Sequence, residues 1–139
     1  MIRLTCAFVM ASLLAACAHD PHADRPCGEL VVFQQPPKRA DLHKLVITRI
    51  NDKAVISQPS YRFKPGQYQL QLMEFIDDPR LAVALKERSY REMTLEVVAD
   101  QRYHLAAQVQ ADALAEPEGY WLPVVWKQFG AACQFASEP

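Results

Sequence analysis

The sequence has few glycines, and they do not cluster. The four glycines are Gly28, Gly66, Gly119 and Gly130. The chain therefore has neither the glycine-rich loop that holds nucleotide phosphates nor the Gly-x-Ser-x-Gly turn that presents a nucleophilic serine. Internal repeats and low-complexity tracts are also missing. Because these signatures are missing, we expect no cofactor and predict that the protein is not an enzyme.

An excess of charge of one sign is missing as well. The 15 Lys and Arg residues nearly balance the 16 Asp and Glu residues, and the formal net charge is −1. Charges of both signs are interspersed along the chain, whereas a nucleic-acid-binding protein usually carries a basic patch or stripe. The sequence therefore indicates no nucleic-acid partner.

The longest apolar run lies at the N-terminus. Residues 4–14 are mostly apolar and follow Arg3. This run is shorter than the roughly 20 residues that span a bilayer. A positive charge, a short apolar run and then small residues are typical of a secretory signal. We predict that residues 1–16 are a signal peptide that is removed.

The signal ends in Leu14-Ala15-Ala16-Cys17, which resembles the lipobox of bacterial lipoprotein precursors. The resemblance implies that Cys17 becomes the first residue of the mature protein and carries the lipid that anchors it to the membrane. The next residue, Ala18, is not the aspartate that commonly retains enterobacterial lipoproteins at the inner membrane. The resemblance therefore favours the outer membrane, facing the periplasm, over inner-membrane retention. The alternative is an ordinary cleaved signal with an unmodified cysteine near the cut.

The remaining cysteines indicate a disulfide. Cys6 lies in the predicted signal and Cys17 in the lipobox, so Cys27 and Cys133 are left in the exported domain. Two cysteines in an oxidising compartment most simply pair with each other. In the chain-entropy model, closing a loop of about 100 residues contributes up to roughly 4.7 kcal/mol. The alternative is a free reactive thiol, but Arg25 is the one cation close to Cys27 in the sequence.

Residues 17–26 are predicted to be the lipid anchor and an extended tether. They contain two prolines and show no apolar periodicity. His19 and His22, with the neighbouring aspartates, are residue types that bind zinc or copper. A polar linker is the simpler interpretation, because a tether supplies neither fixed geometry nor supporting hydrogen bonds. A metal site at these histidines stays the alternative.

Residues 27–139 are predicted to form one mostly β domain. Short alternating segments are separated by turn residues, and the clearest places Tyr68, Leu70 and Leu72 on one face after a Pro65-Gly66 turn. This pattern predicts a single antiparallel β-sandwich of about seven strands. The expected strand segments are residues 29–34, 45–50, 54–56, 61–63, 67–72, 93–97, 103–109 and 120–126.

Residues 79–91 are ambiguous and are the most basic part of the chain. Asp78 before Pro79 suits the start of a helix, whereas Leu81, Val83 and Leu85 alternate as a strand does. We predict a short helical or irregular excursion, with a strand as the alternative. The basic side chains are interpreted as a solvated face, and contact with lipid headgroups or an acidic partner is the alternative.

The last two segments carry the remaining candidate site residues. In residues 103–109 the odd-numbered side chains are expected to face inward, which leaves His104 on the wetter face. In residues 120–126 Pro123 indicates an edge strand, and alternation from Tyr120 places Trp121 outward. Trp121 is therefore a possible exposed partner contact. Packing beneath a loop is the alternative.

Residues 50–72 combine a short extended segment, the Pro65-Gly66 turn and an alternating strand. This unit resembles the PEGA-type and transthyretin-like small β-sandwich modules of bacterial envelope proteins. The resemblance implies a sandwich for binding or spacing, without catalytic residues of its own. The predicted function is accordingly a membrane-anchored envelope lipoprotein that acts as a non-enzymatic binding or structural module, with an unidentified envelope protein as partner. The alternative is a periplasm-facing hydrolase, which needs Ser60 and His104 to meet an aspartate, or a metal-binding carrier.

Overall fold

The computed structural model describes residues 25–135. The predicted signal peptide, Cys17 and the tether up to residue 24 lie outside this range. Eight strands and two 3-10 helices make up the described part. The elements are β1 (Gly28–Val31), η1 (Lys38–Ala40), β2 (Leu42–Ile50), β3 (Lys53–Ala54), β4 (Ser60–Phe63), β5 (Gly66–Phe75), η2 (Leu85–Glu87), β6 (Arg91–Val97), β7 (Gln101–Val109) and β8 (Trp121–Gly130).

The mostly β fold is confirmed, and hydrogen bonds join its strands into one sheet. The strand order is β4-β1-β7-β2-β5-β6, with β3 paired to β2 and β8 paired to β7. The prediction of a purely antiparallel arrangement is wrong at one place, because β1 and β7 run parallel. Alternation of apolar residues does not encode the direction of a neighbouring strand, so the sequence pattern cannot show this.

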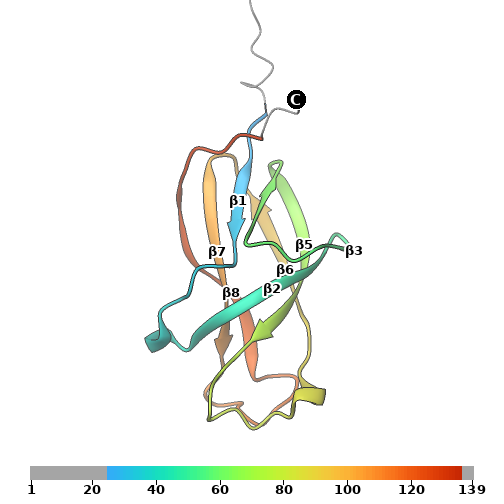
Figure 1. Cartoon of the computed structure of the whole chain (residues 1–139), viewed down its shortest axis with the longest axis vertical. Helices are drawn as coiled ribbons and strands as arrows, with labels where there is room; N and C mark the ends of the chain where they lie inside the picture. Colours follow the sequence, from blue (N-terminus) through green and yellow to red (C-terminus); the bar gives the residue numbers. More distant parts are fainter. Residues whose placement is uncertain (1–24, 136–139) are drawn as a thin grey trace, which may run out of the picture.

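Strand β2 connects the two halves of the sheet, which the prediction treated as two layers of a sandwich. Leu42 and His43 pair with β7, whereas the stretch from Lys44 to Ile50 pairs with β5. A register shift between Ile47 and Arg49 interrupts the ladder of β2 with β5. Figure 1 shows β2 running obliquely across the molecule. Its buried side chains therefore contribute to one core that both halves share.

The core lies on the inner faces of both halves. Large side chains with no exposed surface include Leu30 of β1, Leu70 and Leu72 of β5, and Trp121 of β8. Each fully buried Leu or Val contributes about 1.5–3 kcal/mol relative to an exposed side chain. As the alternation predicts, the inward residues of β7 are also buried. They are Tyr103, Leu105, Ala107 and Val109.

The predicted turn at Asn51-Asp52 is confirmed by its backbone angles. Asn51 and Asp52 between β2 and β3 have φ of 47° and 64°. Positive φ at both central residues is characteristic of the tight hairpin turns that favour Asn and Asp. Gly66 has φ of 152°, which its missing Cβ permits but which is far from the roughly 80° of the type II turn expected at Pro65-Gly66. The prediction of that turn type is wrong, since Gly66 is already the first residue of β5.

The predicted disulfide is present between Cys27 and Cys133, with their Cα atoms 5.1 Å apart. Pro26 forms a bridge with Gln134 beside it, so the last residue of the predicted tether already pairs with the domain. Asp100, in the β6–β7 turn, donates its backbone N–H to the Cys27 carbonyl at 2.8 Å and accepts the Cys133 N–H at 2.9 Å through Oδ1. The two ends of the described chain are therefore held at the same end of the molecule (Figure 1).

Residues 79–91 are mainly irregular, with the short η2 as their helical part and β6 beginning at Arg91. The predicted excursion is confirmed. The predicted helix start at Asp78 is wrong, because Asp78 forms a turn in which its Oδ1 accepts the Arg80 N–H and its carbonyl accepts the Leu81 N–H. Asp side chains commonly stabilise such local turns in place of a helix.

Candidate functional site

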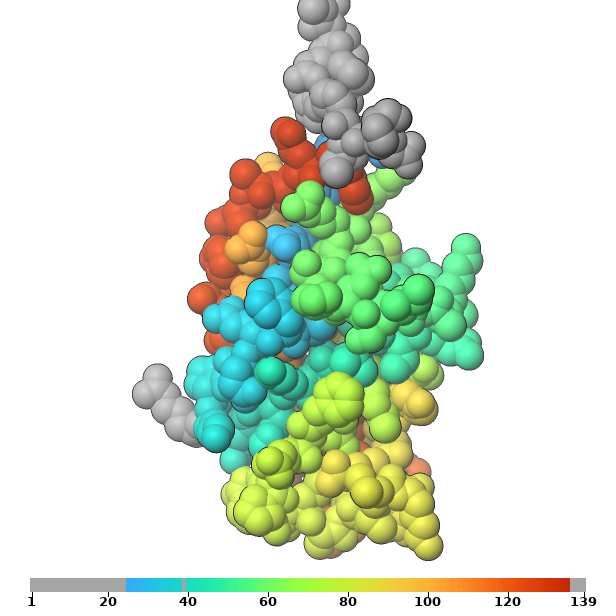
Figure 2. Space-filling model, viewed as in Figure 1, coloured from blue at the N-terminus to red at the C-terminus, as the bar shows by residue number. Residues whose placement is uncertain are grey.

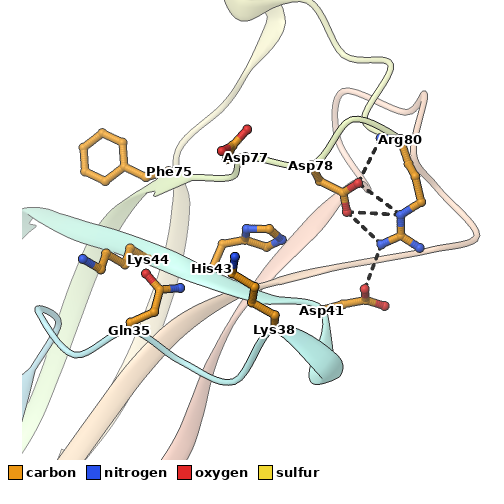
Figure 3. A pocket seen from close by; sticks show the side chains of 9 residues that line it. All are labelled: Gln35, Lys38, Asp41, His43, Lys44, Phe75, Asp77, Asp78 and Arg80. Atoms are coloured by element: carbon orange, nitrogen blue, oxygen red, sulfur yellow. Dashed lines mark hydrogen bonds and ion pairs between the residues drawn. The ribbon is translucent and has the colours of Figure 1, made fainter.

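A polar pocket lies where β2 begins and β5 ends. It has a volume of about 440 Å³. Figure 3 shows its side chains converging from the η1 segment, the start of β2 and the turn after β5. They are Gln35, Lys38, Asp41, His43, Lys44, Phe75, Asp77, Asp78 and Arg80.

The local backbone explains why these segments meet. Asp41 has φ of 54° and ends η1, which lets the chain turn directly into β2. Its carbonyl accepts the Val109 N–H at 2.9 Å and so fixes the turn to β7. Lys44 pairs with Phe75 across the β2–β5 ladder, so both side chains lie on the same face of the sheet.

One edge of the pocket is a charged cluster. The Arg80 guanidinium contacts Asp78 at 2.7 Å and Asp41 at 2.8 Å. Hydrogen bonds from the Arg80 side chain and backbone N–H lower the pKa of Asp78 from 3.8 to about 2. The hydrogen bond with Asp78 also raises the pKa of Arg80. Arg80 is thus neutralised by its partners and is not available to a ligand as a free cation.

Two exposed lysines, Lys38 and Lys44, also line the pocket. Among residues 25–135, no ion pair joins Lys38 or Lys44 to an acidic side chain. Asp77, also exposed, is the acidic lining residue that has no cation partner in the same range. The three basic and three acidic side chains that line this pocket give it no net formal charge, and Lys38 and Lys44 are its basic side chains without an ion pair in the described range.

An apolar depression adjoins the polar pocket. It has a volume of about 260 Å³ and shares Lys44 and Phe75 with the polar pocket. Phe33 lines it as well, and the side chains of Phe33 and Phe75 are each 59% exposed. We call the surface formed by Phe33, Lys38, Lys44 and Phe75 the Phe33–Phe75 face. In Figure 2 the segments that carry it adjoin on one side of the molecule, in cyan, teal and yellow-green.

Sequence reasoning did not single out these phenylalanines. Phe33 precedes the Gln34-Gln35-Pro36-Pro37 stretch that follows β1, and Phe75 ends β5. A usable signal was present for Phe75, because it continues the outward face that carries the glutamines of β5. A large aromatic residue on a polar face is a sign of a binding surface. No comparable signal exists for Phe33, because its exposure depends on the path of the loop.

Glu74 precedes Phe75 in β5 and, unlike Asp77 and Asp78, does not line the polar pocket. It points into the core, where 3% of it is exposed, and accepts hydrogen bonds from the Tyr120 hydroxyl at 3.0 Å and from the Ile76 N–H. Burial raises the pKa of Tyr120. This buried network fixes the turn that carries Phe75 and Asp77 outward.

His104 is buried, and its predicted position on a wetter face is wrong. Only 4% of it is exposed. Its ring stacks on Phe129, with centroids 5.6 Å apart, and meets the edge of Trp126 at 5.5 Å. The alternation correctly places His104 opposite the core, but cannot show that side chains of β8 cover this outer face. Burial lowers the pKa of His104, and the cations Lys127 and Arg102 lower it further.

The hydrolase alternative lacks its central contact. Ser60 pairs with Val31, and Val31 pairs with His104 on its other side. Two strand spacings therefore separate Ser60 from His104, which is roughly 10 Å and too far for a hydrogen bond. Within residues 25–135, neither ring nitrogen of His104 has a hydrogen-bond partner. The structure does not assemble the predicted Ser60–His104 pair.

Trp121 lies inside the core, and its predicted exposure is wrong. Its side chain is fully buried, and its Nε1 donates a hydrogen bond to the Ser89 carbonyl at 3.2 Å. Strand β8 begins at Trp121, which pairs with the inward-facing Val109. The next residue, Leu122, is 49% exposed. Tyr120 precedes β8, so its inward side chain does not determine which residues of the strand face outward. Of the two interpretations of Trp121, packing beneath a loop is the correct one.

The edge position predicted for β8 is confirmed, since among the described strands β8 pairs only with β7. His19, His22 and Cys17 lie outside the described residues, and the structure therefore does not test them. Within residues 25–135, no group of three or more His, Cys, Asp and Glu side chains is placed to hold a metal ion. In this same part of the chain, no helix is both long and apolar enough to cross a membrane.

Comparisons with protein-family models, with curated protein sequences and with solved structures find no match for this chain. The resemblance of residues 14–17 to a lipobox therefore stays a prediction from the sequence. The same holds for the resemblance of residues 50–72 to PEGA-type and transthyretin-like modules.

Proposed function

We propose that this protein is a membrane-anchored lipoprotein of the bacterial envelope that acts as a non-enzymatic binding module through its Phe33–Phe75 face. The observation that carries the proposal is that Phe33 and Phe75, each 59% exposed, line one depression. Large aromatic side chains at a well-defined depression are the residues that most often dominate the energy of a protein interface. The occupant proposed for this face is a segment of a partner envelope protein.

Charge complementarity indicates the chemistry of that segment. Apolar side chains of the partner would cover the two phenylalanines, and a carboxylate would lie near Lys38 and Lys44. Both lysines lack an acidic partner among residues 25–135. Rim charges of this kind steer association and select partners more than they add affinity. A partner segment that is apolar and acidic therefore fits this face better than a basic segment.

The proposed location is the outer membrane, facing the periplasm, with the lipid on Cys17. Seven residues between Cys17 and Arg25 extend at most about 25 Å. The domain and its partner would therefore lie close to the bilayer. Incorporation of labelled palmitate into wild-type protein, and its loss in Cys17→Ser, is the result expected for a lipid anchor.

The partner is tested by crosslinking in intact cells, followed by solubilisation, affinity capture of the tagged protein and mass spectrometry. Three variants are compared with wild type: Phe75→Ser in the face, Leu85→Ser as a matched control and Cys17→Ser without the anchor. Leu85 is 80% exposed and lines none of the depressions described above. We expect a specific envelope protein with wild type and Leu85→Ser, and its loss with Phe75→Ser.

Other outcomes contradict specific parts of the proposal. A partner that is retained by Phe75→Ser would show that binding uses a different surface. Capture of only the tagged chain's own copies would make the face a self-association surface. A partner that is captured equally well by Cys17→Ser would show that membrane anchoring does not position this module.

A further inference from the structure

We propose that a second depression, over the outer faces of β1, β7 and β8, binds a small planar carboxylate beside His104. This site shares Phe33 with the Phe33–Phe75 face, but its other lining residues do not belong to that face. The depression has a volume of about 230 Å³. Its lining residues are Glu29, Val31, Phe33, Gln34, Arg102, His104 and Phe129.

The first argument is an unsatisfied buried polar group. His104 is 4% exposed, and neither of its ring nitrogens has a hydrogen-bond partner within residues 25–135. The indole Nε1 of Trp126, whose ring meets the His104 ring at 5.5 Å, is also buried without a partner. Buried donors and acceptors are nearly always paired, and each exception calls for an explanation such as a bound molecule. A ligand oxygen near these two rings would supply the missing acceptor.

The second argument is that Phe129, one of the β8 side chains that cover His104, is partly exposed at an edge of the sheet. Phe129 stacks on His104 with an interplanar angle of 22° and is itself 36% exposed. It lies near the end of β8, which pairs only with β7 among the described strands. The His104 nitrogens are buried in this arrangement. Phe129 and His104 line the depression together, so a rotation of the Phe129 side chain is the movement that the proposal requires for a ligand to reach the ring nitrogens.

The third argument is the charge of the surroundings. Arg102 contacts Glu29 at 2.8 Å and is neutralised by it, whereas Lys127 has no ion pair with an acidic residue in the described range. Lys127 pairs with His104 in the β7–β8 ladder, and its Nζ lies 5.1 Å from the centroid of Phe129. One uncompensated cation beside the unsatisfied rings favours an anion and disfavours a metal cation.

The fourth argument is the shape and polarity of the walls. Phe33 and Phe129 line the depression, and Val31 lies on its floor beside His104. Aromatic and aliphatic walls with a few polar groups are typical of sites for small organic molecules. A flat apolar body between the phenylalanine rings, with its carboxylate toward His104 and Lys127, uses all of these features. A planar aromatic acid is therefore the ligand class that fits best.

The test is an NMR titration of the ¹⁵N-labelled residues 17–139 with benzoate. Two tryptophans give two indole N–H signals, and Trp126→Phe assigns them. We expect benzoate to shift the Trp126 indole signal and the His104 ring signals saturably, with a dissociation constant in the millimolar range or tighter. The Trp121 indole signal should not shift, because its N–H is already bonded to Ser89 in the core.

Variants and analogues make the result decisive. His104→Phe keeps an aromatic ring beside Phe129, and it should weaken benzoate binding at least tenfold while the Trp121 signal reports an intact core. Lys127→Gln, at an exposed position, gives a second test if His104→Phe does not fold. Benzamide, which has the same ring without the charge, should bind at least tenfold more weakly.

The proposal is overturned if benzoate produces no saturable shift, or if His104→Phe or Lys127→Gln binds it as wild type does. Phosphate that shifts the same signals as strongly as benzoate would show a general anion site and overturn the aromatic-acid class. Phe75→Ser should bind benzoate normally, because Phe75 does not line this depression. Loss of the partner segment and loss of benzoate binding are therefore distinguishable.

Discussion

The Tyr120 hydroxyl donates a hydrogen bond to the Glu74 carboxylate at 3.0 Å inside the core. The same hydroxyl accepts the Ser89 N–H at 3.2 Å, and Arg88 lies 3.6 Å from the carboxylate. The end of β5, the segment before β6 and the residue before β8 therefore meet at one buried polar cluster. It holds the end of β5 in the position that presents Phe75.

Tyr120→Phe is expected to destabilise the protein by about 1–3 kcal/mol, because the substitution leaves the Glu74 carboxylate and the Ser89 N–H without their partner. Urea unfolding measures the change. Tyr68→Phe is the matched control, since the Tyr68 hydroxyl bonds the Lys64 carbonyl in an exposed position, and its effect should stay within about 0.5 kcal/mol. Equal effects of both substitutions would contradict the role given to the buried cluster.

Asp100→Ala should destabilise the protein by about 1–2 kcal/mol. Asp100 has φ of 56° and its Oδ1 accepts the Cys133 N–H, so alanine loses the acceptor and adopts a strained backbone. Asp100→Asn keeps an oxygen and tolerates positive φ. We expect asparagine to retain most of the stability in thermal unfolding. A loss as large as that of alanine would show that the negative charge matters instead.

Removal of the disulfide by Cys27→Ala together with Cys133→Ala should lower the free energy of unfolding by about 2–5 kcal/mol. The two cysteines are separated by 106 positions, so the disulfide restricts nearly the whole described chain in the unfolded state. Unfolding of wild type with and without reductant gives an independent comparison. Unchanged stability in both experiments would mean that the backbone contacts around Asp100 suffice to join the ends.

The protein should become less stable as the pH falls below about 6.5, the ordinary pKa of histidine. Burial and the cations Lys127 and Arg102 lower the pKa of His104, while Glu29 opposes the shift. His104 therefore binds a proton more readily in the unfolded chain than in the folded chain. Its contribution to the free energy of unfolding is present above pH 6.5 and is lost as the pH falls from 6.5 to the lower pKa of His104 in the folded protein.

His104→Phe isolates this effect from other titrating groups. Unfolding is measured in urea at several pH values between pH 7 and about pH 5. The difference in stability between wild type and variant should shift in favour of the variant as the pH falls. A difference that does not change with pH would show that His104 titrates equally in the folded and unfolded chains.

Several features of the fold were predictable because they depend on neighbouring residues. The alternation of Tyr68, Leu70 and Leu72 reports the faces of β5, and Asn51-Asp52 reports a tight turn whose angles only a few residue types tolerate. The disulfide followed from simple elimination once the first two cysteines were assigned to the signal and the lipobox. Pro123 indicated an edge strand because proline lacks the N–H that a second neighbour would need.

The errors have a common physical cause. His104 and Trp121 were assigned to solvent from alternation alone, but burial depends on what covers a face and on where pairing begins. The register shift between His104 and Leu105 in the β7–β8 ladder lies opposite Trp126. This shift changes which residues of β8 face inward on its two sides, and the local sequence does not predict it.

The candidate site shows the same division. Phe75 continues the outward face of the β5 glutamines, yet its direct pairing with Lys44 depends on the register between β2 and β5. Phe33 belongs to a loop whose path is fixed by long-range contacts, such as the hydrogen bond from Val32 to Pro59. The sequence alone therefore did not indicate a shared aromatic face.

The sequence by itself determined the mostly β character, the Asn51-Asp52 hairpin turn and the cysteine pairing, because these depend on backbone preferences, residue periodicity and composition. The tertiary structure decided the parallel contact of β1 with β7, the crossing of β2 between the halves of the sheet and the burial of His104. It also decided that Phe33 and Phe75 share one depression. These features arise from contacts between residues far apart in the chain. The energies of such contacts depend on strand register and on which side chains cover each face of the sheet, and the local sequence predicts neither.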